Sequence, residues 1–288
     1  MDVAVVGMGR IGRAIALRLL SAGHKVTVWN RTPGRASDVV AAGAKEAGSP
    51  EEAAEGARSV HLSLAGDQAV DEVVLGGSAP DSAGLAAALG DAALVDHSTV
   101  APITSRRIAD AVPGGRMIAA PVLGGPEAVE KGTAFYLLAG PPSEVEALDP
   151  LWRALSPSHR FCGEDQGVAT TLKLLANYLL MSGLATLSET IATGQAAGID
   201  NGTLREFFTT IPLIAPGLVN RLDALIAGDH DGWFSARLGA KDVRLTAELA
   251  GSVGVDLPIA ALIQRRYEEL DAHGLGDADI SAIIELLR

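Results

Sequence analysis

The sequence predicts an α/β chain in two parts, a doubly wound parallel sheet followed by an all-helical domain. Three observations predict it. Short β-branched runs alternate with Ala-rich helical stretches as far as Gly163, and strand patterns disappear from Gln166 onward. The 288 residues are 48% hydrophobic, which suffices for two cores. We therefore expect a domain of residues 1–163 and a helical domain of residues 164–288, joined directly by a long helix.

Six runs in the first part carry the strand pattern: Asp2–Val6, Lys25–Trp29, Ser59–Leu64, Ala93–Asp96, Met117–Val122 and Phe135–Ala139. Amphipathic segments such as Ile11–Ser21 and Thr104–Ala111 lie between them. Strands that alternate with helices predict βαβ units. The strands are continuously apolar rather than alternating, which favours a sheet covered on both faces.

The second part shows one long helical pattern and five shorter ones: Gln166–Ser188, Leu204–Thr209, Leu218–Ile226, Leu238–Val253, Ile259–Ala272 and Ile280–Leu287. The long pattern is also the one candidate for a membrane span. It contains Lys173, Asn177 and several hydroxyl side chains. These polar groups favour a buried bundle helix, and we expect no membrane partner.

Composition excludes several classes of function. The formal net charge of −12 argues against nucleic-acid binding, which needs a basic face. The single cysteine, Cys162, forbids an internal disulfide and suits a reducing compartment. The apolar N-terminal run lacks the features of a signal peptide, so a cytoplasmic location is expected. No histidine lies at a ligand spacing, and no metal site is predicted.

A glycine-rich motif, Gly7-Met8-Gly9-Arg10-Ile11-Gly12, follows the first strand and opens a helix. In a G-x-G-x-x-G turn the first glycine permits the tight bend and the second lets a pyrophosphate approach the backbone. The third allows close packing of helix and strand. The helix N-terminus then offers N–H groups to the anion. The motif predicts a dinucleotide-binding Rossmann domain with these six residues at the cofactor; the alternative is a purely structural turn.

The end of the second strand bears on the choice of cofactor. An NAD site usually places Asp or Glu there, but this chain has Asn30-Arg31-Thr32. A guanidinium can bind a 2′-phosphate through two hydrogen bonds. We therefore predict NADP(H) in preference to NAD(H), with Asn30, Arg31 and Thr32 as cofactor contacts. The alternative is that Arg31 points into solvent.

Lys173 stands out inside the long apolar helix, because burying an ammonium is costly without partners. Asn177 lies four residues later and hence on the same helical face. Together they could present a proton donor and an amide to a small polar ligand. The alternative is that Lys173 reaches solvent at the helix edge.

Two loops carry polar or flexible groups directly after apolar strands. One contains Ser98 and Thr99, whose hydroxyls can bind a carboxylate or carbonyl, and the other contains Gly124 and Gly125, which allow close approach to backbone N–H groups. In doubly wound sheets such loops lie on the cofactor side. Helix capping and an ordinary turn remain the alternative.

The order of these motifs resembles the β-hydroxyacid dehydrogenases, a family that includes 3-hydroxyisobutyrate dehydrogenase and glyoxylate/succinic semialdehyde reductases. The resemblance covers nearly the whole chain: Gly7 to Gly12, Asp96 to Pro102, Ala120 to Gly125, Gly167 to Asn177, and Lys241-Asp242. It implies an NADPH-dependent oxidoreductase that interconverts a small β-hydroxy acid, or a related alcohol, and its aldehyde or ketone. It also implies a homo-oligomer, a dimer or tetramer.

The resemblance implies a role for each matching residue. Lys173 would be the catalytic acid/base, and Asn177 would help to hold the substrate. Thr99 would border both substrate and nicotinamide. The remaining positions would be substrate contacts at Ser98, Leu123, Gly124 and Gly125, and cofactor contacts at Leu64, Ala65 and Lys241.

Departures from the family pattern leave the substrate open. Leu123 stands where the family usually has a serine that holds the substrate carboxylate, so a less polar aldehyde or ketone is an alternative. The related imine reductases share the style of residues 27–32 but generally carry Asp or Tyr in place of Lys173. Reduction of C=N substrates is therefore the second hypothesis. A non-catalytic NADP-binding protein is the third, and the presence of Lys173 counts against it.

Overall fold

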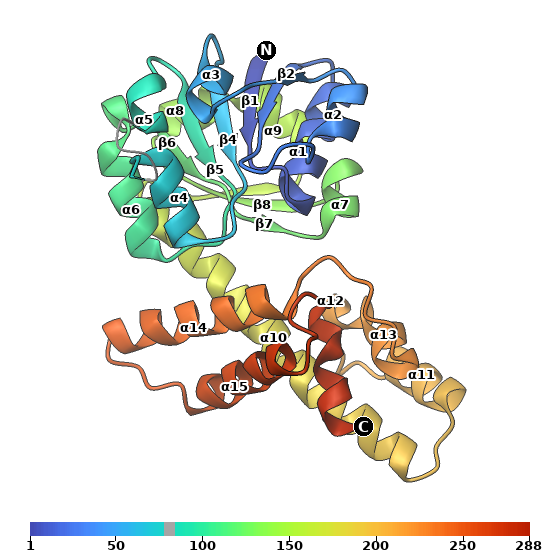
Figure 1. Ribbon diagram of the computed structural model, residues 1–288. Coiled ribbons are helices and arrows are strands. Elements are labelled where there is room, and N and C mark those ends of the chain that lie inside the picture. The colour runs from blue at the N-terminus through green and yellow to red at the C-terminus, as the bar shows by residue number, and fades with distance from the viewer. Residues whose placement is uncertain (78–83) are drawn as a thin grey trace. The chain divides into compact units, whose positions relative to one another are not determined.

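The computed structural model describes residues 1–77 and 84–288, and the chain in it divides into two compact units, residues 1–173 and 174–288 (Figure 1). The division falls inside one continuous helix, α10 (Gln166–Ala196), which contributes to both units. The predicted order, a Rossmann domain followed by a helical domain that starts with a long helix, is confirmed.

The first unit is built on a nine-stranded sheet in the order β3-β2-β1-β4-β5-β6-β8-β7, with β9 paired to β8. Pairing is parallel from β3 to β6 and between β8 and β9, whereas β8 is antiparallel to β6 and β7. The strands are β1 (Asp2–Val6), β2 (Lys25–Trp29), β3 (Lys45–Glu46), β4 (Ser59–Leu62), β5 (Ala93–Asp96), β6 (Met117–Ala119), β7 (Val122–Leu123), β8 (Phe135–Ala139) and β9 (His159–Gly163).

Helices cover both faces of this sheet, as Figure 1 shows. They are α1 (Arg10–Ser21), α2 (Ser37–Ala41), α3 (Pro50–Ala54), α4 (Asp67–Val74), α5 (Leu85–Ala88), α6 (Pro102–Ala111), α7 (Pro126–Glu130), α8 (Pro142–Ala147) and α9 (Asp149–Leu155), with a 3₁₀ turn η1 (Pro113–Gly115). Successive strand residues point to opposite faces, so Val5 packs in one core with Ile15 and Trp152, and Val6 packs in the other with Val70 and Ile108.

The structure corrects the sequence-based boundaries at the edge of the sheet. The expected strand Met117–Val122 is two strands, β6 and β7, because Pro121 has no N–H to continue the ladder. The expected strand Ser59–Leu64 ends at Leu62, since the Leu64 amide donates to Ser98 Oγ instead. Strands β3 and β9 were not predicted, because β3 has two exposed residues and β9 has no apolar run.

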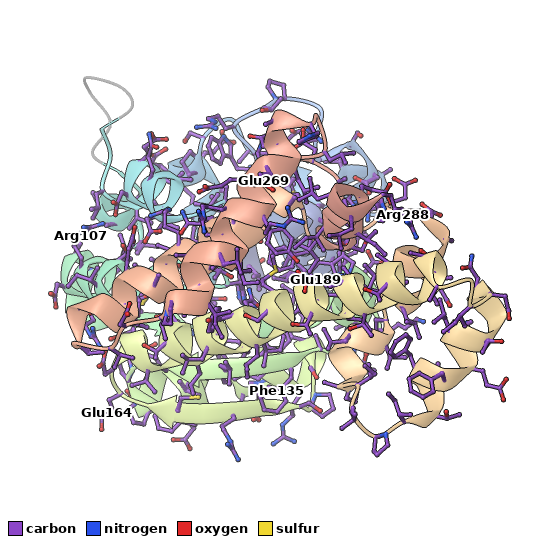
Figure 2. All side chains as sticks on the ribbon, turned by 90° about the horizontal axis from the view of Figure 1, so that it is seen from below. Arg107, Phe135, Glu164, Glu189, Glu269 and Arg288 are labelled. Atoms are coloured by element: carbon purple, nitrogen blue, oxygen red, sulfur yellow. The ribbon has the colours of Figure 1, made fainter. Side chains whose placement is uncertain are left out.

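Apart from one antiparallel β-bridge between Ser235 and Asp279, the regular structure described in the second unit is helical. After α10 come α11 (Asn201–Thr210), α12 (Pro216–Val219), α13 (Leu222–Ala227), α14 (Ala236–Ser252), α15 (Pro258–Ala272) and the 3₁₀ helix η2 (Ile280–Leu287). Figure 2 shows the side chains along α10, with Glu189 labelled. The helix runs eight residues beyond its expected end at Ser188. Gly194 permits this extension against α11, since a Cβ there would lie 2.7 Å from Leu204 Cδ2.

Among the described residues, α10 is the one helix long and apolar enough, by length and composition, to cross a membrane. Within its most apolar window, 44% of the residues are buried in the protein. Met181, Leu184 and Ile191 are fully buried in the core of the helical unit, against side chains such as Tyr267 and Ile284. These contacts are those of a core helix.

Candidate functional site

The glycine-rich turn after β1 has three glycines with three different structural reasons. Gly7 has a φ of +99°, and a Cβ on Gly7 or Gly12 would come closer than 3.0 Å to backbone oxygen. A Cβ on Gly9, in contrast, would meet nothing within 4 Å. Helix α1 also begins at Gly9 without a side-chain cap. The turn therefore leaves space beside an uncapped helix N-terminus, which suits a pyrophosphate.

The residues after β2 lie beside this turn. Asn30 Oδ1 accepts a hydrogen bond from the Met8 amide at 2.9 Å, and Asn30 Nδ2 donates to the carbonyl of Thr32. Asn30 thus holds the glycine-rich turn against the end of β2. Arg31 has a side chain that is 81% exposed, and its Nη1 lies 3.4 Å from Glu72 Oε2 of α4.

Glu72 is a carboxylate that the sequence pattern did not associate with Arg31. It also accepts a hydrogen bond from Gln68 Nε2 at 2.8 Å. No acidic residue follows β2 directly, but α4 brings one to the guanidinium. Glu72 would compete with a 2′-phosphate for Arg31, so the local charge favours NADP less strongly than the sequence suggested.

The loops after β4 and β5 are joined by a side-chain hydrogen bond. The Leu64 amide donates to Ser98 Oγ at 2.9 Å, and the Ser98 amide donates to Asp96 Oδ1 at 2.9 Å. Ser98 is buried, while Thr99 and Leu64 are half-buried and Ala65 is exposed. The Ser98 hydroxyl accepts a hydrogen bond from Leu64, and its O–H could donate one to a ligand.

Leu123, the last residue of β7, and Gly124 and Gly125, which follow that strand, are all half-buried. Gly124 has a φ of +138°, and a Cβ there would lie 3.3 Å from the Cβ atoms of Ala128 and Ala134. Backbone conformation and packing therefore explain why position 124 is a glycine. Gly125 precedes α7 and provides no side-chain cap to that helix. The Leu123 side chain packs against the core of its own unit.

The first unit thus gathers the predicted groups at one edge of its sheet. The glycine-rich turn, the Arg31 loop, and the loops after β4 and β5 all follow the carboxyl ends of parallel strands. The strand order reverses between β1 and β4, which is where a doubly wound sheet binds its ligand. The structure holds these loops together as a dinucleotide site requires.

A buried carboxylate organises the predicted residues of the helical unit. Asn177 Nδ2 donates to Asp242 Oδ2 at 2.5 Å, and Lys241 Nζ lies 3.1 Å from Asp242 Oδ1. The side chain of Asp242 is 2% exposed and that of Lys241 is 17% exposed. Lys173, one helical turn before Asn177, is half-buried. Asp242 therefore fixes the Asn177 amide and the Lys241 ammonium relative to each other.

Asp242 is the member of this cluster that the sequence analysis did not single out, since it entered only as the neighbour of Lys241. The buried face of α14 carries Gly239, Val243, Thr246 and Ala250, and Asp242 lies among them. An acidic residue on the apolar face of an amphipathic helix is unusual without a partner. That position was the available signal.

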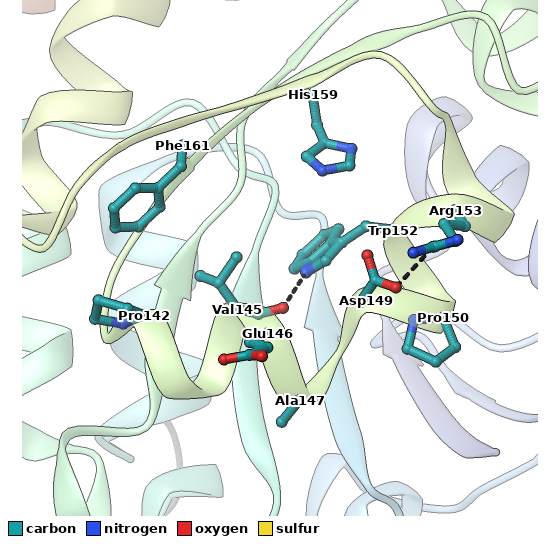
Figure 3. A pocket seen from close by; sticks show the side chains of 10 residues that line it. All are labelled: Pro142, Val145, Glu146, Ala147, Asp149, Pro150, Trp152, Arg153, His159 and Phe161. Carbon is teal, nitrogen blue, oxygen red and sulfur yellow. Dashed lines mark hydrogen bonds and ion pairs between the residues drawn. The ribbon is translucent and has the colours of Figure 1, made fainter.

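A separate cavity of about 720 Å³ lies against α8, α9 and β9 (Figure 3). Its polar groups already have partners: Trp152 Nε1 donates to the Val145 carbonyl, and Arg153 Nε lies 2.7 Å from Asp149 Oδ2. None of the predicted site residues lines it. The chemistry therefore points to the carboxyl edge of the sheet rather than to this cavity. Within residues 1–77 and 84–288, no group of three or more His, Cys, Asp or Glu side chains could hold a metal ion.

Comparison with known proteins agrees with this arrangement. The NAD-binding domain of 6-phosphogluconate dehydrogenase matches residues 2–163, and the family described as NAD-binding of NADP-dependent 3-hydroxyisobutyrate dehydrogenase matches residues 167–287. The chain is 30% identical to 3-hydroxyisobutyrate dehydrogenase of Pseudomonas aeruginosa, over 100% of this chain and 98% of that protein. It is 31% identical to the chloroplastic glyoxylate/succinic semialdehyde reductase 2 of Arabidopsis thaliana, over 100% and 80%.

Solved structures show the same fold. The crystal structure of 3-hydroxyisobutyrate dehydrogenase from Salmonella typhimurium superposes with a TM-score of 0.89 at 23% identity, over 99% of each chain. An imine reductase from Pseudomonas sp. superposes with a TM-score of 0.66 at 21% identity, over 100% of this chain and 99% of that one. Relatives also differ in cofactor, since the chain is 30% identical to an NAD-dependent L-serine dehydrogenase of P. aeruginosa, over 99% and 97%.

Proposed function

Because this chain belongs to the 3-hydroxyisobutyrate dehydrogenase-like family of β-hydroxyacid dehydrogenases, we propose that it interconverts a small β-hydroxy acid and its aldehyde or ketone with NADPH. It is an NAD(P)-dependent oxidoreductase of the type that acts on CH–OH groups. The finer assignments, Lys173 as acid/base and NADPH as the preferred cofactor, are our proposal.

The observation that carries the proposal is the buried Asp242. Its two oxygens hold Asn177 and Lys241, the two residues that the family pattern assigns to substrate and cofactor. Lys173 lies one turn before Asn177 on the same face of α10. A fixed amide beside a lysine provides one group that orients a substrate and one that exchanges a proton with it.

The bound dinucleotide supplies the hydride in reduction and accepts it in oxidation. In reduction, the Lys173 ammonium donates a hydrogen bond to the carbonyl oxygen and transfers its proton as that oxygen gains negative charge. The products are the alcohol and a neutral lysine, which regains a proton from solvent. In oxidation, neutral Lys173 removes the hydroxyl proton. Asn177 holds the substrate throughout.

The residues around the glycine-rich turn fit a nicotinamide dinucleotide. Gly9 leaves space for the pyrophosphate, the start of α1 offers backbone N–H groups, and the Arg31 guanidinium would bind a 2′-phosphate. The family pattern would add Lys241 as a further cofactor contact. We expect NADPH to be preferred over NADH, but by a moderate factor because Glu72 lies beside Arg31.

Leu123 bears on the class of substrate. Its side chain is apolar and packs in the first unit, where a serine in this position would offer a hydroxyl. The loop can still bind an anion through backbone N–H groups, although more weakly than with a hydroxyl added. Relatives of the chain are named for glyoxylate, succinic semialdehyde and 3-hydroxyisobutyrate, so we propose these three compounds as the first substrates to test.

The experiment compares the wild-type chain with Lys173→Ala. NADPH consumption is followed with glyoxylate, succinic semialdehyde and a cyclic imine, NADPH formation is followed with 3-hydroxyisobutyrate and NADP⁺, and NADPH binding is followed by its fluorescence. We expect turnover with 3-hydroxyisobutyrate or at least one of the two aldehydes, a loss of at least about 100-fold in kcat for Lys173→Ala, and unchanged NADPH binding. Lys45→Ala is the control, because that lysine is 70% exposed and pairs with Glu52, which is not among the proposed site residues.

Each result has a separate meaning. Turnover with the cyclic imine alone would overturn the assignment in favour of C=N reduction. Tight NADPH binding without turnover would indicate a non-catalytic binding protein. Near-normal turnover of Lys173→Ala would contradict the acid/base assignment while leaving the oxidoreductase class intact.

We also propose that the chain forms a homo-oligomer. Leu172, Leu175 and Leu179 lie at helical spacing on α10 and are 39%, 46% and 73% exposed. A second copy would cover these leucines. Sedimentation should show a dimer or tetramer, and Leu179→Glu should shift it toward the monomer. A wild-type monomer at micromolar concentration would contradict this proposal.

A further inference from the structure

A chain of buried polar side chains crosses three neighbouring strands of the sheet. Ser59 Oγ lies 3.1 Å from His61 Nε2 on β4, and His61 Nδ1 lies 2.9 Å from Nε2 of His97, directly after β5. His97 Nδ1 in turn lies 2.8 Å from the carbonyl oxygen of Ala120, directly after β6. Ser59, His61 and His97 are all buried. Neither histidine has a part in the reaction described above.

The hydrogen bonds determine which ring nitrogens carry protons. A carbonyl oxygen can only accept, so His97 Nδ1 must donate to Ala120. His97 Nε2 then accepts from His61 Nδ1, and His61 Nε2 accepts from the Ser59 hydroxyl. Every polar atom of the two rings is therefore used when both rings are neutral. Burial lowers the pKa of both histidines, that of His97 to about 4, so both are neutral near pH 7.

The surroundings also favour the neutral rings. The two imidazoles stack with centroids 5.2 Å apart, and the edge of Tyr136 contacts His97 with centroids 5.7 Å apart. A charge on His97 would repel a charge on His61, and His24 adds to the repulsion at His61. Protonation of His97 at Nε2 would also turn an acceptor into a donor and break the hydrogen bond that His61 Nδ1 donates to it.

His97 replaces a missing bond of the sheet. The Leu94 amide donates to the Arg116 carbonyl, and the ladder pairs Asp96 with Ala119. In a parallel ladder every second residue of a strand donates to every second residue of its neighbour, so the bond expected next in this series would join the Ser98 amide to the Ala120 carbonyl. The Ser98 amide instead donates to Asp96 Oδ1, and the Ala120 carbonyl accepts from the His97 ring. The chain thus leaves the strand at Ser98, and Ala120 stays joined to β5 and its following residue through two bonds: its amide donates to the Asp96 carbonyl at 2.7 Å, and its carbonyl accepts from the His97 ring.

The two segments joined in this way carry the candidate substrate residues of the first unit. Ser98 and Thr99 follow His97 directly, and Leu123 to Gly125 follow Ala120 after two residues. Ser98 is also tied to the loop after β4 through the Leu64 amide. The hydrogen bond from the His97 ring to the Ala120 carbonyl thus links the segment that leads into the Thr99 loop to the segment that leads into the Gly124–Gly125 loop.

We propose that His97, supported by His61, is a positioning residue that sets the separation of the Thr99 loop and the Gly124–Gly125 loop. This inference rests on the proposed function, because those loops matter only if they contact the substrate. His97 does not contact the substrate itself. It acts through Ser98, Thr99 and the backbone after Ala120.

Two matched variants separate the two bonds of the His97 ring. Asn in this position keeps a donor near the place of Nδ1 and so retains the bond to Ala120. Gln places its amide near Nε2, keeps the contact with His61 and loses the bond to Ala120. We expect His97→Gln to lower kcat/KM at least about tenfold, mainly through kcat, and His97→Asn to stay within about threefold of wild type. NADPH affinity should be unchanged in both.

A spectroscopic readout does not depend on turnover. Nitrogen-15 NMR of the wild-type chain with labelled histidine should show His61 and His97 as neutral Nδ1–H tautomers near pH 7. Signals showing Nε2–H at His97 would overturn the proposal even if no variant folds. So would equal kcat/KM for His97→Gln and wild type. A wild-type chain that reduces no carbonyl would overturn the proposed function, and the positioning role with it.

Discussion

The glycine-rich turn makes a sharp prediction, because two of its glycines face opposite environments. A Cβ on Gly9 would meet no atom within 4 Å, whereas a Cβ on Gly12 would approach the Gly7 carbonyl oxygen to less than 3.0 Å and the Ser63 Cβ to 3.1 Å. The same added methyl group should therefore affect binding at one position and folding at the other. Gly9→Ala and Gly12→Ala form a matched pair.

The magnitudes follow from this geometry. Gly9 has a φ of −71°, which alanine adopts without strain, so Gly9→Ala should change the free energy of unfolding by less than about 1 kcal/mol. Its methyl group would occupy the pyrophosphate position and weaken NADPH binding at least about tenfold, or about 1.4 kcal/mol. Gly12→Ala forces backbone against backbone and should cost about 1–3 kcal/mol of stability.

Thermal unfolding with and without NADPH measures both effects. A ligand at about 100 times its Kd stabilises the folded state by about 2.7 kcal/mol, so the wild-type Tm should rise with NADPH. Gly9→Ala should keep the Tm of the free protein and lose most of the rise. Gly12→Ala should lower the Tm of the free protein by several degrees. Normal NADPH binding by Gly9→Ala, or wild-type stability of Gly12→Ala, would refute the reasoning.

Three further predictions concern charge. The pKa of His97 is near 6.5 in the unfolded chain and about 4 in the folded protein, so below about pH 6.5 unfolding is accompanied by proton uptake. The free energy of unfolding, measured by urea titration, should therefore be highest above about pH 6.5 and fall by about 3 kcal/mol toward pH 4. A flat profile would contradict the buried neutral ring. Asp242→Asn should lower kcat/KM about tenfold and the free energy of unfolding by about 2 kcal/mol, whereas Asp277→Asn, on an exposed pair, should change either little. Arg31→Ala should raise the KM for NADPH about tenfold without changing the KM for NADH. Glu72→Gln should lower the KM for NADPH, because it removes the carboxylate that competes for Arg31. Equal effects of Arg31→Ala on both cofactors would exclude a contact between Arg31 and the 2′-phosphate.

Local sequence patterns were sufficient where each element has its own signal. The bounds of β1, β2, β5 and β8 match the expected ones because each is an apolar run bounded by turn residues. The glycine-rich turn was predictable for the same reason, since its signal lies within six neighbouring residues and the backbone itself requires glycine at Gly7 and Gly12. The strand β9 could not be predicted from the sequence, because it has no continuous apolar run and is defined by its pairing with β8.

The end of α10 shows the same limit in a helix. Residues after Ser188 have no strong stop signal until Gly198, which has a φ of +86°. The helix continues because α11 packs against it at Gly194. Arg288, labelled in Figure 2, then donates to the carbonyl oxygens of Leu225 and Ile226 and closes the helical unit.

The sequence by itself determined the α/β fold class, the position of the dinucleotide turn, and the lysine and asparagine on α10, because periodicity and motif spacing act over a few neighbouring residues. Only the tertiary structure decided which polar groups meet. Asp242 reaches Asn177 across 65 residues, His97 reaches His61 across 36, and Glu72 reaches Arg31 across 41. Hydrogen bonds and ion pairs require atoms within about 3.5 Å, and packing, not the local pattern, brings such distant residues to that distance.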